Sequence, residues 1–236
     1  MYNYIINPKT GRKVSIYGKV GKSIITKYHS QKDAGGSIGC TAIDLNYPQG
    51  KRTIYFPSDN KFKKCSVIKR VMKGGIWEQR ITKQIYNDLA ELKKKNLNTI
   101  AIDIGANIGA HTISMLDGVS QGGFVIAFEP QIEIANCLEN TLAKISSNNF
   151  IISTNLVSNK NSISNFVSNG TGRSRIPLKN NHYNKDWSHK NVKTTTLDKF
   201  LLDHPTNNLK VSLIKIDVEG HEFEVLEGAS NTIKKK

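Results

Sequence analysis

Apolar residues switch between helical and strand-like spacing along most of this 236-residue chain. Between residues 77 and 95 they recur every three or four positions, which predicts an amphipathic helix with one apolar stripe. Short apolar runs and helical patterns then alternate, as is typical of a doubly wound parallel sheet. We expect an α/β fold with strands at 99–104, 124–128, 150–156 and 211–216, and helices at 108–116 and 132–145.

Glycines mark a joint near the front of the chain. Residues 33–39 read DAGGSIG, and such a density of glycine disfavours any regular element. We therefore expect a small module over residues 1–36, a linker over 37–52 and the main domain over 53–236. Within that domain, residues 157–191 are rich in Asn, Ser and Lys and break the alternation. They predict a long insertion of the kind that often builds substrate sites.

Positive charge is concentrated in the front part of the chain. The formal net charge is +15, and residues 1–96 hold 20 Lys and Arg against 6 Asp and Glu. The remaining residues, 97–236, are nearly balanced, with 14 against 13. A basic segment of this kind attracts nucleic acid or another anionic partner. A lysine-rich solubilising face explains the same composition equally well.

Cysteine usage and hydropathy bear on the compartment. Cys40, Cys65 and Cys137 lie far apart without any zinc-binding spacing, so they are expected to be reduced thiols without an assigned role. No apolar run approaches the roughly 20 residues that span a bilayer. The first residues also lack the pattern of a signal peptide. These features predict a soluble, intracellular protein without a membrane partner.

Residues 101–112, AIDIGANIGAHT, join an apolar strand to a helix through Gly105 and Gly109. Glycines let the backbone turn sharply and approach a ligand, and the amides of the helix start form a polar cradle. The loop lacks the Gly-Lys-Ser/Thr of a phosphate-binding P-loop. It also lacks the GxGxxG of a dinucleotide site, because Asn107 stands where the middle glycine would lie.

The following strand ends in Glu129, 26 residues after Asp103. An acid at that strand end can accept hydrogen bonds from both ribose hydroxyls. The pattern favours a ligand with a ribose but no pyrophosphate, such as S-adenosylmethionine. Asp103 would then approach its methionine part, while Gly105 and Gly109 would give it room. The alternative is that Glu129 is a surface acid before a proline that starts a helix.

Three motifs together resemble the FkbM family of S-adenosylmethionine-dependent methyltransferases: DIGANIGAHT, FEPQIEIANCLENTL and IKIDVEGHEFEVLEGA. The resemblance runs from about residue 53 and includes the upstream GGIWE, with Glu78. It implies a Rossmann-like methyltransferase fold and methyl transfer to oxygen, often on sugars or polyketide-like products. The cofactor-binding residues expected are Glu78, Asp103, Gly105, Asn107, Gly109, His111 and Glu129.

The resemblance also suggests that the sheet lacks its last strands, because FkbM chains continue beyond the motif at 214–229. Strand 211–216 would then be an exposed edge, which favours association. We expect either a shortened product that pairs that edge, for instance in a dimer, or covers it, or a protein whose activity has decayed.

The first residues, INPKTGRKVSIYGKVGKSIITKY, resemble short amino-terminal modules on proteins of giant and other large DNA viruses. The cysteines expected at the edges of the viral two-cysteine adaptor module are missing. The resemblance implies a viral protein located in the host cytoplasm or the virion.

Candidate catalytic residues follow the strand at 211–216. Ligands in open α/β sheets lie outside the carboxyl ends of the strands, where Asp217 falls. We expect Asp217 to act as a general base or as a ligand of a divalent metal. Candidates around it are Glu219, His221 and Glu222. Alternatively, Glu222 complements the helix dipole and Lys215 pairs with Asp217.

Other side chains could contact the ligands. His111 could point at the cofactor carboxylate or the acceptor, or simply pack in the first helical turn. Trp187 and Arg173 in the insertion are candidate contacts for a small-molecule or glycan hydroxyl acceptor.

A protein of a different class would also fit the sequence. The methyltransferase fold could be inert, and the basic front part could bind nucleic acid or a protein. The chain has no NPPY-type motif for methylation of an exocyclic amine, which disfavours a base methyltransferase.

Overall fold

The computed structural model describes residues 4–6, 13–15, 39–169, 174, 176–177, 187–204 and 209–234. The chain divides into two compact units, Met1–Gly39 and Cys40–Lys236. In the first unit, β1 (Tyr4–Ile6) pairs antiparallel with β2 (Lys13–Ser15). Most residues of the expected basic module lie outside the described ranges, so the module and its viral resemblance stay predictions.

The second unit is built around a parallel sheet of four strands. These are β5 (Thr99–Ile104), β6 (Phe124–Phe128), β7 (Phe150–Ser153) and β11 (Lys210–Ile216), in the order β11-β5-β6-β7. All neighbouring pairs are parallel. Every residue of β5 is buried, as expected for a parallel strand covered on both faces. The α/β fold class with a parallel sheet is therefore confirmed.

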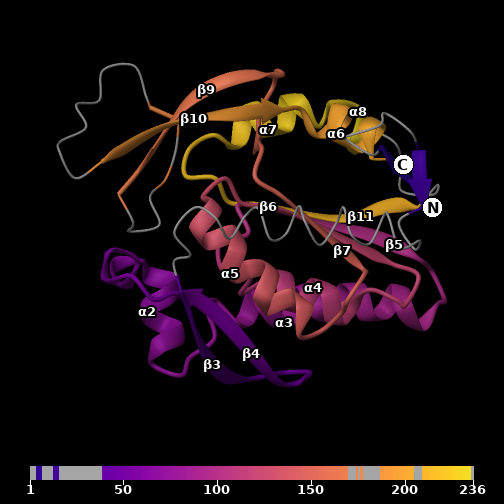
Figure 1. The fold of residues 1–236 in the computed structure, drawn as a ribbon. Coiled ribbons are helices and arrows are strands. Elements are labelled where there is room, and N and C mark those ends of the chain that lie inside the picture. Colours follow the sequence, from indigo (N-terminus) through magenta and orange to yellow (C-terminus); the bar gives the residue numbers. More distant parts are fainter. Residues whose placement is uncertain are drawn as a thin grey trace. The chain divides into compact units, whose positions relative to one another are not determined.

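Helices cover both faces of this sheet (Figure 1). On one face lie α3 (Gln79–Lys94), α4 (Thr112–Gly118) and α5 (Ile132–Ala143). On the other lie α6 (Leu197–Asp203), α7 (Glu222–Gly228) and α8 (Ser230–Lys234). Alternate residues of a strand point to opposite faces, so Ala101 packs with the first group and Ile102 with the second.

A hairpin occupies most of the segment expected to be a linker. β3 (Cys40–Tyr47) pairs antiparallel with β4 (Gly50–Pro57), so the linker predicted over 37–52 is wrong from residue 40 onward. The hairpin forms because one face of each strand is apolar and packs on the main domain, with Leu45 and Ile54 buried. Its side chains also reach α4, since Arg52 binds the Asp117 carboxylate at 2.8 Å. η1 (Asn60–Lys64) and α2 (Ser66–Met72) follow.

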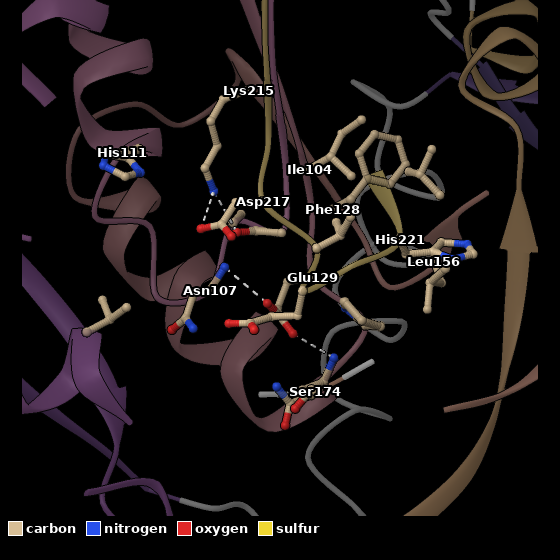
Figure 2. Close-up of a pocket in the computed structure, with 18 of the residues that line it drawn as sticks. Ile104, Asn107, His111, Phe128, Glu129, Leu156, Ser174, Lys215, Asp217 and His221 are labelled. Atoms are coloured by element: carbon tan, nitrogen blue, oxygen red, sulfur yellow. Dashed lines mark hydrogen bonds and ion pairs between the residues drawn. The ribbon is translucent and has the colours of Figure 1, made fainter. Parts of the chain in front are cut away.

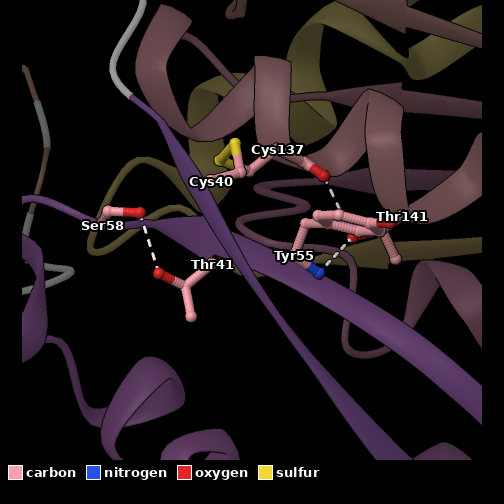
Figure 3. Close-up of a disulfide and its surroundings, with 6 residues drawn as sticks. All are labelled: Cys40, Thr41, Tyr55, Ser58, Cys137 and Thr141. Atoms are coloured by element: carbon pink, nitrogen blue, oxygen red, sulfur yellow. Dashed lines mark hydrogen bonds between the residues drawn. A yellow bond between two sulfur atoms is a disulfide. The ribbon is translucent and has the colours of Figure 1, made fainter.

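A disulfide joins Cys40 in β3 to Cys137 in α5 (Figure 3). The expectation of three reduced thiols is therefore wrong for these two, and only Cys65 is free. The half-cystines are 97 residues apart, so the pairing depends on tertiary contact and leaves no local spacing in the sequence. Beside the bond, the Tyr55 backbone N–H donates to Thr141 Oγ1 at 2.9 Å.

Reducing this disulfide should lower the free energy of unfolding by about 2–4 kcal/mol, because the cross-link restricts the unfolded chain over a long loop. Urea unfolding with and without dithiothreitol measures the change. The Cys40→Ala variant should unfold at one midpoint in both buffers. A wild-type midpoint that ignores the reductant would contradict the expectation.

The polar insertion forms a second, smaller sheet. β8 (Leu156–Val157), β9 (Ser162–Ser168) and β10 (Ser188–Thr195) associate in the order β8-β10-β9. Its central strand β10 is parallel to β8 and antiparallel to β9. The described parts of the insertion thus contain more regular structure than its composition suggests. In the main sheet β11 is an outer strand, paired with β5 alone within the described ranges.

Candidate functional site

A cavity of about 410 Å³ lies at the carboxyl ends of β5, β6 and β11 (Figure 2). This is the position at which open α/β sheets bind ligands. It brings together seven of the residues predicted from sequence. They are Gly105, Asn107, His111, Glu129, Asp217, Glu219 and His221. The predicted residues Glu78, Asp103, Gly109 and Glu222 do not line it.

Glu129 is a buried carboxylate at the end of β6, and only 4% of it is exposed. One oxygen accepts the backbone N–H of Asn107 at 3.0 Å and the other that of Gln131 at 2.9 Å. Burial raises the pKa of Glu129 to about 7, although these backbone hydrogen bonds oppose the shift. The interpretation of Glu129 as a surface acid is therefore wrong, because the side chain is fixed inside the cavity wall.

The glycine loop brings β5 close to the end of β11. Gly105 has φ +83°, and a Cβ atom there would overlap the backbone carbonyl oxygen of Asp217. Only glycine therefore fits this close approach. Asn107 also adopts a left-handed conformation, at φ 51°. Gly109 serves packing instead, because a Cβ there would press on Leu138.

Asp103, Lys215 and Asp217 form a charge cluster that contacts the glycine loop. Asp103 is fully buried and accepts a hydrogen bond from Thr112 Oγ1 at 2.6 Å. Lys215 Nζ lies 3.1 Å from Asp103 Oδ1 and 3.8 Å from Asp217 Oδ2. It also donates to the Gly105 carbonyl oxygen at 2.9 Å. Asp103 thus organises the site through Lys215 and does not line the cavity itself.

Lys215 is the functional residue that the sequence interpretation undervalued. Burial lowers the pKa of its ammonium group, but the carboxylates of Asp103 and Asp217 outweigh this and leave the pKa raised. The side chain is therefore a fixed positive charge that lines the cavity. The sequence carries a signal for it, because Lys215 and Asp217 alternate on one strand.

The segment after β11 holds the other catalytic candidates. Glu219 lines the cavity in a left-handed conformation, at φ 56°. His221 also lines it, but its Nδ1 is 3.2 Å from Glu224 and its Nε2 is 3.0 Å from Ser158 Oγ. Both ring nitrogens of His221 therefore face protein groups. Burial lowers the pKa of His221, against the two neighbouring glutamates.

Glu222 stabilises the loop that carries these residues. Its Oε1 accepts the backbone N–H groups of Val218 at 3.1 Å and Gly220 at 3.2 Å. It lies outside the cavity lining, so its position fits the structural alternative better than a catalytic role.

Strain at Glu219 offers a test of its function. Replacement by glycine removes the strain of a left-handed non-glycine residue, about 1–2 kcal/mol. It also raises the backbone entropy lost on folding, which costs about 0.5–1 kcal/mol. Glu219→Gly should therefore keep its stability within about 1 kcal/mol in urea unfolding, while the activity expected from the sequence resemblance falls. Asn96→Gly is a matched control, because Asn96 has φ 56° and is outside the cavity lining. Equal activity in both variants would contradict a role for the Glu219 carboxylate.

Glu78 and His111 form a pair at the cavity wall. His111 is buried and lines the cavity, and its Nε2 lies 3.4 Å from Glu78 Oε2. Trp77 lines the cavity beside them and was not predicted. Of the candidate acceptor contacts, Trp187 is outside the lining and Arg173 lies outside the described residues.

The described residues contain neither a metal-binding cluster nor a membrane-spanning helix. Across the described ranges, His, Cys, Asp and Glu side chains form no group of three that could hold a metal ion. The expected metal-ligand role of Asp217 therefore has no supporting donor set there. No helix in the described part of the chain has both the length and the apolarity needed to cross a membrane.

A protein-family model matches the part of the chain that forms most of this site, whereas no curated protein matches the chain. The model of the methyltransferase FkbM domain matches residues 103–236, which is more than half of the chain. The matched region contains the glycine loop, Glu129 and the whole segment after β11. The chain therefore belongs to the FkbM methyltransferase family.

Proposed function

We propose that this chain transfers a methyl group from S-adenosylmethionine to a hydroxyl group of a small-molecule or glycan acceptor. The observation that carries the proposal is Glu129, a buried carboxylate held by two backbone amides at the end of β6. Both oxygens keep further lone pairs for the ribose hydroxyls.

The other residues around the cavity suit the same cofactor. Phe128, Leu156 and Val157 give apolar surface for the adenine ring, and Asn155 adds an amide beside them. Gly105 has no side chain and lets the loop approach the Asp217 backbone closely, which leaves room for the methionine part of S-adenosylmethionine. Family membership supports methyl transfer, and these residues support S-adenosylmethionine as the donor.

The methyl group of a sulfonium is already activated, so alignment of donor and acceptor is the main task of the protein. Lys215 fixes the glycine loop and Asp217 relative to each other through its three contacts. Asp217 and Glu219 face the cavity from the end of β11, where they can accept hydrogen bonds from other hydroxyl groups of the acceptor and so orient it.

A second cavity of about 320 Å³ adjoins the first. The two share the lining residues Pro130, Gln131 and Phe166. The site therefore has space for an acceptor beside the cofactor, and this space suits an acceptor of the size of a sugar. A sugar is the acceptor that the family resemblance favours.

Mass spectrometry tests the proposed reaction. The protein is incubated with S-adenosylmethionine and a pool of sugars and sugar nucleotides, and products are searched for the mass gain of one methylene. We expect methylated products that disappear in Glu129→Ala. Products formed equally by both proteins, or by neither, would count against the proposal.

The basic front part supports a second candidate, an inert fold that binds nucleic acid. Its supporting observation is the excess of 20 Lys and Arg over 6 Asp and Glu in residues 1–96. Binding through phosphate contacts should weaken steeply as salt rises. Salt-dependent DNA or RNA binding without cofactor binding would favour this candidate.

A further inference from the structure

His111 is a buried histidine whose side chain lines the cavity. Only 4% of the residue is exposed, and Nε2 has no hydrogen-bond partner among the described residues. Nε2 lies 3.4 Å from Glu78 Oε2, so we assign the proton of the neutral ring to Nε2, on the side of the carboxylate. Nδ1 is then the nitrogen that can accept a proton.

Glu78 lies near His111 and has a strained backbone. It precedes α3 with φ 41° and ψ 54°, a left-handed conformation that costs a non-glycine residue energy. Its side chain makes no capping hydrogen bond to the helix, and the carboxylate lies near the imidazole instead. Strained residues cluster at functional sites, which agrees with a role for Glu78.

The charges around His111 set its protonation state. Burial lowers its pKa and Lys215 lowers it further, while Asp103, Glu78 and Asp217 raise it. The net shift is downward, so the imidazole is neutral at pH 7. A neutral imidazole beside a carboxylate can accept a proton and have the resulting charge stabilised.

His111 lies on the side of the site away from the apolar adenine surface. Figure 2 shows His111 across Lys215 and Asp217 from Leu156 and His221. The other histidine of the cavity, His221, has both nitrogens directed at Glu224 and Ser158. His111 is therefore the cavity histidine with the capacity to serve a ligand.

We propose that His111 is the general base that removes the proton from the acceptor hydroxyl, and that Glu78 is its positioning residue. The proposal rests on the proposed methyl transfer and adds the group that receives the proton. It replaces the expectation that Glu78 and His111 bind the cofactor.

The proton and electrons balance in one displacement. The acceptor oxygen forms a bond to the methyl carbon as its O–H proton passes to Nδ1 of His111, while Nε2–H stays directed at Glu78. The electron pair of the carbon–sulfur bond returns to sulfur, which loses its positive charge. Glu78 stabilises the imidazolium, and its half-exposed side chain gives the proton a route to water.

Two measurements separate a base from a cofactor contact or a packing residue. In His111→Gln, S-adenosylmethionine affinity should stay within about twofold of the wild type in calorimetry. Methyl incorporation into the sugar and sugar-nucleotide pool should fall about 100-fold or more. His204→Gln, an exposed histidine change outside the cavity, is the control for both.

Diethyl pyrocarbonate tests the imidazole independently of any acceptor, since it acylates neutral, accessible histidines. Mass spectrometry of the six histidines should show His111 labelled in the folded protein. Glu78→Gln removes a charge that raises the His111 pKa, so labelling should persist to lower pH. The matched change Glu91→Gln should leave the profile as in the wild type.

Three results would overturn the inference. They are His111 labelled only after unfolding, a pH profile unmoved by Glu78→Gln, and full methyl incorporation by His111→Gln. Loss of S-adenosylmethionine binding in His111→Gln would indicate that His111 contacts the cofactor and is not the base. Failure of the wild type to bind S-adenosylmethionine would instead contradict the proposed function.

Discussion

Replacing Lys215 by methionine should lower the free energy of unfolding by about 3–5 kcal/mol, because it leaves a buried carboxylate without its partner. Asp103 is fully buried, and Lys215 Nζ lies 3.1 Å from its Oδ1. Methionine keeps most of the length of the lysine side chain. The decrease in the free energy of unfolding therefore comes from the missing charge and not from a new cavity. Urea unfolding monitored by circular dichroism measures it.

The matched control is Lys190→Met. Lys190 pairs with Glu133 at 3.2 Å, but 54% of the Lys190 side chain is exposed. Exposed pairs contribute roughly 0–1 kcal/mol, so this variant should be close to the wild type. The double variant Lys215→Met/Asp103→Asn should recover part of the loss, because the buried acid becomes neutral. Equal losses in the two lysine variants would contradict the importance of the buried cluster.

Replacing Glu129 by glutamine should weaken S-adenosylmethionine binding by about 100-fold or more, since hydrogen bonds to a charged group contribute about 1.5–3 kcal/mol each. The side-chain NH₂ group of the glutamine would also face the backbone N–H of Asn107 or Gln131. Each of these N–H groups needs an acceptor, so one of them would lose its hydrogen bond. Calorimetry on the wild type, Glu129→Gln and the control Glu91→Gln makes the comparison.

The pH dependence gives a second signature of Glu129. Its pKa is about 7 without cofactor, and the ionised form is the better acceptor for ribose hydroxyls. Wild-type affinity should therefore rise about tenfold between pH 6 and pH 8. Glu129→Gln should lose this dependence. A wild-type affinity that is constant over this range would contradict the assignment of Glu129 to the ribose.

Stability should respond to the same group with the opposite trend. The folded-state pKa is raised above the unfolded one, so the native protein holds the proton to higher pH. The contribution of Glu129 to stability is complete below about pH 4.5 and is lost as pH rises through about 7. The cofactor-free protein should thus become less stable over this window, and Glu129→Gln should remove that part of the change.

Local patterns were sufficient to predict the central sheet and its ligand side. The runs at 99–104 and 124–128 are apolar because helices cover both faces, which makes such strands easy to recognise. The run at 211–216 is recognisable from its apolar residues, although these are only partly buried. Gly105 and Glu129 stand at strand ends, where the topology alone fixes their common location. Those two residues required no knowledge of side-chain contacts.

Tertiary contacts determined what the sequence did not predict. The Cys40–Cys137 disulfide joins residues 97 positions apart. The hairpin at 40–57 buries only one face, so its apolar alternation is short and interrupted by turn residues. The strained backbone of Glu78 is a conformation that propensity rules do not anticipate. The sequence placed His111 near the ligands, but its pairing with Glu78 required the fold.

Calorimetric titration of the purified protein with S-adenosylmethionine measures whether the cavity holds the proposed cofactor. We expect saturable binding by the wild type and none by Gly105→Arg, because a side chain at that position would overlap the Asp217 backbone and block the ligand. Asn96→Gly, which changes the backbone outside the cavity lining, should bind like the wild type. A folded wild-type protein that shows no binding would contradict the assignment of this cavity to S-adenosylmethionine.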